Sequence, residues 1–154
     1  MGRTLNPSIA GGEAGRYGKQ SREILEKGTP GLAALVASIT DEFDNMGGVL
    51  KTIDGGFVRC HSARAALNYK LQSAGAIVMK VAAILARKEI RRLGLDTMLV
   101  GTIHDEGQLD AKEEDAETVG KICCQAIRDA GKLLGFHVPL DGDYKVGPDW
   151  ASCH

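Results

Sequence analysis

Residues 98–110 read Met-Leu-Val-Gly-Thr-Ile-His-Asp-Glu-Gly-Gln-Leu-Asp, and this stretch governs the interpretation of the rest of the chain. An apolar, β-branched run leads to three consecutive ionisable residues, His104, Asp105 and Glu106, after which alternation resumes. The pattern predicts two short strands joined by a tight turn near Glu106 and Gly107, with ionisable side chains at the tip. Such a tip suits a metal or proton-transfer site, and it equally suits a solvated hairpin turn. The tripeptide alone does not separate the two.

The two adjacent carboxylates favour a hard cation if the tip is a site. In regular strand geometry Asp105 and Glu106 would point to opposite faces, but a turn relaxes this and leaves one or both near an ion. Mg²⁺ takes oxygen ligands and commonly keeps one or two protein carboxylates, completed by phosphate oxygens and water. A His-Asp pair also resembles that of metal-dependent phosphohydrolases. Those carry it on a helix, which the β-branched flank argues against.

Composition limits the classes of protein that remain. The chain has 154 residues, 44% of them hydrophobic, which is enough for one modest domain. With 19 basic and 20 acidic residues there is no global basic field, so any nucleic-acid interface must be local. The four cysteines show no C-x-x-C spacing, so we expect reduced thiols rather than structural zinc. We find no signal peptide and no run of about 18 apolar residues, and we expect a soluble, cytoplasmic protein without a membrane partner.

The spacing of apolar residues, glycines and prolines predicts the remaining elements. The chain begins with a glycine-rich loop or weak helix over residues 1–18 and a short helix over 19–27. A helix then starts at Pro30, with Thr29 as cap, and ends at Gly47-Gly48; a hairpin over 49–60 follows and turns at 54–56. A long helix runs from the possible cap Ser62 to about Leu93, and after the strand pair a last helix covers 113–134. The long helix carries an apolar stripe that includes Leu71, Val78 and Ile84. This order of elements predicts an α+β fold.

Three polar residues of the long helix follow one another at intervals of four: Arg64, Asn68 and Gln72. At 100° per residue they drift by only about 40° per step, so they share one face. Arginine and amide donors suit the minor groove of a duplex, where every base pair presents acceptors at purine N3 and pyrimidine O2. An ordinary solvated face has the same spacing, and from spacing alone it is the better interpretation.

Several stretches join these features into one pattern. They are Ala65-Ala66-Leu67-Asn68, Leu71-Gln72-Ser73-Ala74-Gly75-Ala76, His104-Asp105-Glu106, and the terminal Trp150 through His154. In this order and at these intervals they resemble the C-terminal part of family A DNA polymerases, the polymerase I-like enzymes, and most closely the phage replicative branch. The likeness also reaches back through Thr29-Pro30 and the hairpin at Asp54-Gly55, so it covers most of the chain.

The resemblance implies a role for each matched position. Asp105 corresponds to the palm aspartate that helps to hold two catalytic Mg²⁺ ions, and Glu106 to the neighbouring, less essential carboxylate. His104 is implied to lie near the primer terminus, and His154 in a C-terminus that folds back beside the active site. The residues implied to contact primer and template in the minor groove are Arg64, Asn68 and Gln72. The implied chemistry is attack of a primer 3′-hydroxyl on the α-phosphate of a deoxynucleotide, with two metals stabilising the attacking and leaving oxygens.

Two parts that the resemblance leads us to expect are missing from the sequence. These are a first palm aspartate, which shares the metals, and a fingers helix, which grips the triphosphate. We therefore expect residues 1–48 to be the C-terminal part of the helical fingers and residues 49–154 to be the palm. One carboxylate cluster cannot hold two metals alone, so we do not expect the chain to polymerise DNA by itself.

The chain is accordingly interpreted as the C-terminal portion or subunit of a split template-directed DNA polymerase, or as a piece of a longer one. Its expected partners are primer–template DNA, deoxynucleoside triphosphates, and an N-terminal polymerase chain carrying the exonuclease-like region, the thumb, the first palm aspartate and the fingers helix. One alternative is a non-catalytic duplex-DNA-binding module derived from a polymerase. The lowest-ranked alternative is a stand-alone metal-dependent phosphoesterase built on His104 and Asp105.

Overall fold

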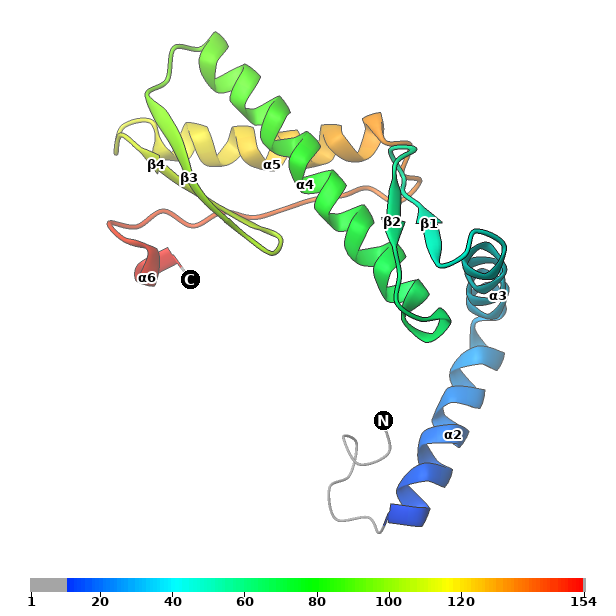
Figure 1. Cartoon of the computed structure of the whole chain (residues 1–154). Coiled ribbons are helices and arrows are strands. Elements are labelled where there is room, and N and C mark those ends of the chain that lie inside the picture. Colours follow the sequence, from blue (N-terminus) through cyan, green and yellow to red (C-terminus); the bar gives the residue numbers. More distant parts are fainter. Residues whose placement is uncertain (1–10, 154) are drawn as a thin grey trace. The chain divides into compact units, whose positions relative to one another are not determined.

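The longest element is the helix α4, Ala66–Arg92 (Figure 1). Its burial repeats every four residues. One ridge of α4 is buried, and it consists of Val78, Ala82, Ala86 and Ile90. The ridge two residues out of step with it is exposed, and it consists of Asn68, Gln72, Ala76, Lys80, Ile84, Lys88 and Arg92. Two residues turn a helix by about 200°, so the two ridges lie on opposite sides. The apolar stripe expected from the sequence was therefore wrong at Leu71 and Ile84, which are 61% and 56% exposed.

The second helix of the core is α5, Ala116–Leu133, and it packs against α4 through small side chains. Ala82 and Ala86 of α4 meet Ala126 and Ala130 of α5 in one buried cluster with Val78. Half-buried apolar residues surround this cluster: Val81, Leu85, Ile122, Cys123, Ile127, Leu134 and Leu140. Small side chains therefore form the buried centre of the contact, and larger, half-buried residues surround it.

The strand pair follows α4 directly. β3 (Thr97–Ile103) and β4 (Glu106–Ala111) form a two-stranded antiparallel sheet. Leu99 pairs with Leu109 and Gly101 with Gln108, so Val100 is an extra residue that forms a bulge. The strand pair, α4 and α5 confirm the predicted α+β class.

The N-terminal elements are α2 (Gly11–Gly28) and α3 (Pro30–Asn45), followed by the strands β1 (Val49–Lys51) and β2 (Phe57–Arg59) and the 3-10 turn η1 (Ala63–Ala65). Pro30 begins α3 as expected, but Thr29 does not cap it with its side chain, because its hydroxyl donates backwards to the carbonyl of Leu25. Ser62 likewise makes no side-chain cap bond. The hairpin turn is confirmed at Asp54–Gly56, where Gly55 has a φ of 86°.

The computed structural model describes residues 11–153. By internal contacts the chain divides into one unit comprising Met1–Leu50 with Arg59–Leu67 and a second comprising Lys51–Val58 with Asn68–His154. The core cluster, the strand pair and most of α4 belong to the second unit. The assignment of residues 1–48 to fingers and 49–154 to palm stays a prediction.

One expectation about membranes needs correction. The segment Ala63–Arg92 is long and apolar enough, by length and composition alone, to cross a membrane, whereas no such segment was expected. A core helix of a soluble protein meets the same criteria, and α4 carries the buried ridge described above. Packing against α5 accounts only for that ridge, because 17% of the apolar window is buried.

Candidate active site

The turn between β3 and β4 consists of two residues, His104 and Asp105. Ile103, the last residue of β3, pairs directly with Glu106, the first residue of β4. Within residues 11–153, His104 is the one non-glycine residue with a positive φ, 56°. A positive φ at the first turn position is typical of two-residue hairpin loops, because it matches the twist of the strands. The turn predicted at Glu106 and Gly107 was therefore wrong, since both residues pair within the ladder.

The three ionisable residues of the tip differ in their surroundings. The side chains of His104 and Asp105 are exposed, whereas Glu106 is half-buried. The Glu106 carboxylate accepts a hydrogen bond from Nε2 of Gln108 on the same strand. Residues two apart on a strand share a face, so Gln108 orients Glu106 from below the tip. Sequence reasoning missed this role of Gln108, although the two-residue interval is the signal that would have revealed it.

The tip offers oxygen ligands of the kind that Mg²⁺ prefers, but few of them. Asp105 presents an exposed carboxylate at the turn, and Glu106 presents a second one beside it. Mg²⁺ commonly binds through one or two protein carboxylates together with phosphate oxygens and water, so this donor set fits such an ion as part of a site. Within residues 11–153, no three His, Cys, Asp or Glu side chains come together as a metal site. Among the described residues, the tip therefore offers two neighbouring carboxylates, and no third residue of these types joins them as a metal ligand.

The predicted DNA-contacting residues lie on α4 and on the turn before it. Asn68 and Gln72 are exposed, one helical turn apart, and they begin the exposed ridge of α4. Arg64 is also exposed, but it lies in η1, within the first unit. Lys70, between the two amides in sequence, donates from Nζ to the carbonyl of Lys51 at 2.6 Å and thereby ties α4 to the end of β1. His154 lies outside the described residues.

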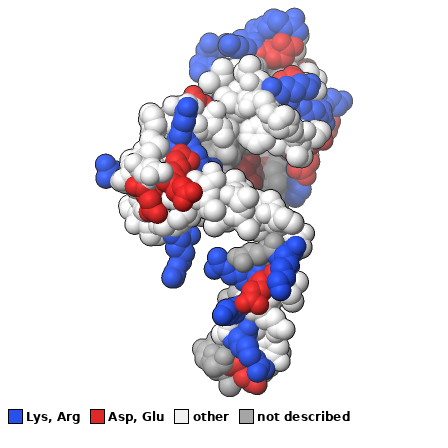
Figure 2. All heavy atoms as spheres, turned by 90° about the vertical axis from the view of Figure 1, so that its right-hand side faces the viewer, with Lys and Arg blue, Asp and Glu red and all other residues white. Residues whose placement is uncertain are grey.

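Charge is distributed locally rather than as a single field. Figure 2 shows basic and acidic side chains interspersed on the face it presents, including the stretch along α2 at its lower end. This agrees with the net charge of −1. The net charge therefore gives no overall attraction for a polyanion, and only local groups could provide one.

Comparisons with known proteins identify the family to which this chain is similar. The sequence profile described as DNA polymerase family A matches residues 52–152, which contain the β3–β4 turn and both amides of α4. The chain belongs to DNA polymerase family A. Among its relatives, the DNA-directed DNA polymerase of Escherichia phage T7 is 32% identical over 157 residues, covering 89% of this chain and 22% of the phage protein. DNA polymerase I of Aquifex aeolicus is 32% identical over 87 residues, covering 56% of this chain and 15% of that protein.

A solved structure shows the same fold for this family A chain. The POL domain of Pol1 from M. smegmatis, in complex with DNA primer-template and dNTP, has a TM-score of 0.67 and 22% identity, covering 82% of this chain and 24% of that one. The predicted resemblance to phage and bacterial polymerases is confirmed at the level of the family. The present chain spans 22% of the T7 polymerase and 24% of the POL-domain chain. The roles of individual residues remain predictions.

Proposed function

We propose that the chain is the C-terminal portion or subunit of a template-directed DNA polymerase that acts in the cytoplasm. In this proposal it contributes Asp105 as a metal-binding carboxylate, with Glu106 beside it, to nucleotidyl transfer. A further polymerase sequence, carried by a separate chain or by the rest of a longer one, supplies the first palm aspartate and the nucleotide-binding fingers helix. The single observation that carries the proposal is the family A match over residues 52–152, which includes this turn.

The geometry of the turn supports the role of Asp105. A two-residue loop restrains the backbone of Asp105, because Ile103 and Glu106 are held in a ladder pair on either side. Bound Mg²⁺ would stabilise the negative charge that develops on the attacking and leaving oxygens. Asp105 would hold the ion at the turn, Glu106 would add charge beside it, and His104 would face the primer terminus.

The surface of β3 supports the need for a further polymerase sequence. Three consecutive apolar residues, Met98, Leu99 and Val100, are 61%, 50% and 59% exposed. Successive residues of a strand point to opposite faces, so both faces of the hairpin are partly uncovered. Isolated two-stranded hairpins are at best marginally stable in water. A segment that covers β3 would bury these side chains and would also approach the turn.

The exposed amides of α4 support contact with primer and template. Asn68 and Gln72 point donors away from the core at the start of the exposed ridge. They would test the geometry of base pairs in the minor groove without reading their sequence. Arg64 would contact the same duplex from η1, and His154 would lie in the tail that folds back beside the site.

Primer extension tests the catalytic part of the proposal. The chain is mixed with the product of an upstream reading frame that carries the missing aspartate and fingers helix, together with Mg²⁺, primer–template and nucleotides. We expect extension with the mixture and none with either chain alone. Asp105→Ala should abolish it, whereas Asp110→Ala, an exposed acidic residue farther along β4, should leave it unchanged. Extension that survives Asp105→Ala would refute the assignment.

Duplex binding without catalysis is the second candidate function, and the exposed amides favour it as well. It predicts that the chain alone binds duplex DNA in a salt-dependent manner that Asp105→Ala does not alter. If the mixture never extends primers while this binding persists, the binding function stands and the catalytic one fails. Turnover of a generic phosphodiester by the chain alone would instead support a stand-alone phosphoesterase.

A further inference from the structure

The segment between α5 and the C-terminal helix α6 (Trp150–Cys153) forms a strap along α5. Residues 136–149 have no regular helix or strand pairing. Leu140 lies against Gly131, Gly142 against Ile127, and Tyr144 against Gly120. From Leu140 to Tyr144 the strap proceeds toward the C-terminus, while its contacts on α5 move from Gly131 back to Gly120. The strap therefore runs antiparallel to α5. Every second residue of the strap therefore faces the helix, as in an extended chain.

The contact at Gly120 is the tightest of the three. A Cβ built on Gly120 would lie 2.5 Å from Cγ and 2.6 Å from Cε2 of Tyr144. Real side-chain contacts essentially never come this close, so any larger residue at position 120 must displace the ring. The ring is rigid, so it cannot bend aside as a flexible chain end would. Gly120 therefore forms a notch in α5 that the Tyr144 ring fills.

A second notch lies three turns away on the same side of α5. Gly131 follows Gly120 by eleven residues, which rotates the helix by only about 20° beyond three turns. A Cβ on Gly131 would lie 2.9 Å from Cγ of Leu140. Glycine inside a helix costs about 1 kcal/mol relative to alanine, so two such residues on one side need a packing reason. The two notches supply that reason.

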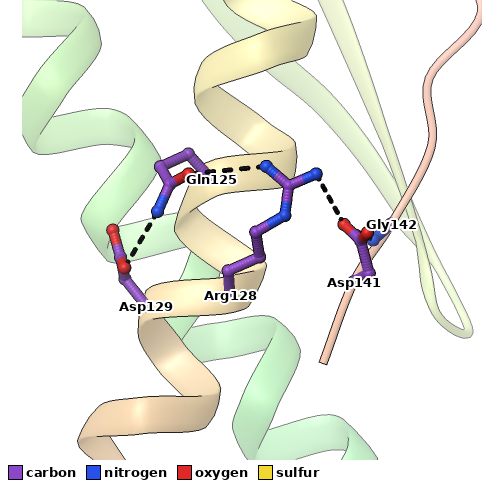
Figure 3. Close-up of polar contacts among 5 residues, drawn as sticks. All are labelled: Gln125, Arg128, Asp129, Asp141 and Gly142. Atoms are coloured by element: carbon purple, nitrogen blue, oxygen red, sulfur yellow. Dashed lines mark hydrogen bonds and ion pairs between the residues drawn. The ribbon is translucent and has the colours of Figure 1, made fainter. Parts of the chain in front are cut away.

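Polar contacts accompany the notches. The Arg128 guanidinium pairs with the Asp141 carboxylate at 2.9 Å, and the same carboxylate accepts from the amide of Gly142 at 2.8 Å (Figure 3). The Tyr144 hydroxyl donates to Glu117 at 2.6 Å. The side chains of Arg128 and Asp141 are 44% and 66% exposed, so their ion pair adds little to stability. The shape of the notches, rather than charge, fixes the strap.

The order of side chains along the strap favours a single register on α5. A shift by one residue would replace the inward-facing Leu140, Gly142 and Tyr144 by Asp141, Asp143 and Lys145. Neither notch would then be filled, and three charges would face the helix. The register seen in the structure is therefore strongly preferred over its neighbours.

A short turn follows the strap, and hydrogen bonds between Asp149 and Ser152 stabilise it. The carboxylate of Asp149 accepts from the amide of Ser152 at 2.9 Å, and the Ser152 hydroxyl donates to the Asp149 carbonyl at 2.7 Å. Gly147 lies against the side chains of Ser152 and Cys153. Only a few residues separate Tyr144 from this turn, so seating the ring limits how far α6 can lie from α5.

We propose that Tyr144, seated on Gly120, is a positioning residue that fixes the strap and thereby holds the C-terminal turn in place for DNA synthesis. The seating itself stands on the contacts described above, and its use in DNA synthesis rests on the proposed function. Glycine at position 120 and an aromatic ring at position 144 form a matched pair: changing either one alone opens the strap.

The seating is tested on the chain of 154 residues without DNA. Two readouts report on the strap: tryptic cleavage after Lys145, and the fluorescence anisotropy of Trp150, the one tryptophan of the sequence. Tyr144→Ala and Gly120→Ala should each speed cleavage by on the order of tenfold, because cleavage follows the population of the open form. Both should lower the anisotropy. Tyr144→Phe, which keeps the ring, should stay close to the wild type.

A matched control separates the notch from the effect of a glycine-to-alanine change in a helix. Gly75 lies inside α4 with no atom within 4 Å of a Cβ built on it, so Gly75→Ala should leave both readouts unchanged. If Gly120→Ala fails to fold, Tyr144→Ala still tests the seating, since it only removes atoms. Cleavage and anisotropy that stay at wild-type levels in Tyr144→Ala would overturn the seating.

The positioning role is tested in the primer-extension mixture described above. Tyr144→Ala should lower kcat while the KM for nucleotide changes little, and Tyr144→Phe should restore kcat. Wild-type kcat in a Tyr144→Ala variant whose strap is open would overturn the positioning role alone. Absence of extension by the wild-type mixture would overturn the proposed function, and the positioning role with it, while the seating would stand on the cleavage result.

Discussion

The strap on α5 and the β3–β4 hairpin differ in how far their apolar side chains are covered by other parts of the chain. On α5, two glycines receive Tyr144 and Leu140 from the chain's own C-terminal segment. On β3, Met98, Leu99 and Val100 remain largely exposed, although they are as apolar as the residues in the core. Both regions belong to the second unit. The difference, within residues 11–153, is that a neighbouring segment of the chain lies against α5 while the apolar side chains of β3 stay exposed.

This contrast distinguishes a helical side, where the chain buries its own apolar residues, from a sheet side, where it leaves them exposed. On the helical side, α4, α5 and the strap pack together, and Ala130 is fully buried. The sheet side consists of two strands, and the Asp105 turn lies at the end of this open element. Within the second unit, the described apolar residues are therefore better covered on α5 than on β3, the strand that leads to the Asp105 turn.

Overpacking the closed side should have the largest effect. Ala130→Leu inserts three carbon atoms into a fully buried helix contact, and we expect it to lower the free energy of unfolding by about 2 kcal/mol. Ala83→Leu makes the same exchange at an exposed position of α4, where surface substitutions change stability by less than about 0.5 kcal/mol. Urea unfolding of both variants, followed by circular dichroism, measures the difference. Equal stabilities would mean that the α4–α5 contact is not the core.

The sequence predicted the elements of this contact better than its details. Apolar spacing located α4 and α5 within a few residues of their ends, because helical periodicity is a local property. It did not show that the buried residues of α4 are Val78, Ala82, Ala86 and Ile90, which leaves Leu71 and Ile84 outside the core. That choice depends on how closely α5 approaches, and the distance between two helices is not encoded in the spacing of either one.

The candidate site was predictable in position but not in geometry. Three consecutive ionisable residues after a β-branched run located the tip, yet the turn lies at His104 and Asp105 because Glu106 and Gly107 complete the ladder. Pairing across strands fixes the register, and a single strand does not carry that information. Gly120 and Tyr144 lie 24 positions apart in sequence, so their contact was visible only once the strap had been placed on α5.

The side-chain amides of Gln125 and Gln72 differ in the same way as the two surfaces. Gln125 of α5 is committed within the chain, since it donates to Asp129 at 3.0 Å and accepts from Arg128 at 3.4 Å. Gln72 of α4 is exposed on the ridge proposed to meet DNA. We expect Gln72→Ala to weaken duplex binding by about 1 kcal/mol, equally for unrelated sequences, because minor-groove acceptors are common to all base pairs. Fluorescence titration with several labelled duplexes at one salt concentration measures this change.

Gln125→Ala is the matched control for that titration, since it removes an amide that is already satisfied on another helix. It should leave duplex affinity unchanged. A loss confined to one duplex sequence in Gln72→Ala would contradict the minor-groove interpretation, and an equal loss in both variants would point to a general effect on folding.

The open side should tolerate polar substitution. Leu99→Thr places a β-branched residue, which suits a strand, at a position that is 50% exposed, so we expect the stability of the chain alone to change by less than about 0.5 kcal/mol. The same variant should reduce self-association at high concentration, because it interrupts the exposed apolar run of β3. Thermal unfolding and light scattering on one preparation test both statements. A large loss of stability would show that the chain itself covers β3.

The strap should respond to pH with a smaller effect, confined to alkaline solution. The hydrogen bond from the Tyr144 hydroxyl to Glu117 raises the pKa of this phenol above its ordinary value of 10.0, and burial and the negative charges of Glu117 and Cys124 act in the same direction. A raised pKa means that the bond stabilises the seated ring at pH values below 10 and that this contribution is lost as pH rises through the higher pKa. Lys121 and Asp143 also line this hollow beside Tyr144. Tryptic cleavage after Lys145 in wild-type protein should therefore accelerate, relative to a reference peptide, only above pH 10.

The Tyr144→Phe variant shows whether that response belongs to the hydroxyl. Phenylalanine has no proton to lose, so its cleavage rate relative to the peptide should stay level across the same range. Asp141→Asn, which weakens only the exposed ion pair with Arg128, should keep the alkaline step of the wild type. An alkaline step of equal size in Tyr144→Phe would assign it to general loosening of the chain. In that case the fit of the ring to Gly120, without the hydroxyl, would account for the seating of Tyr144.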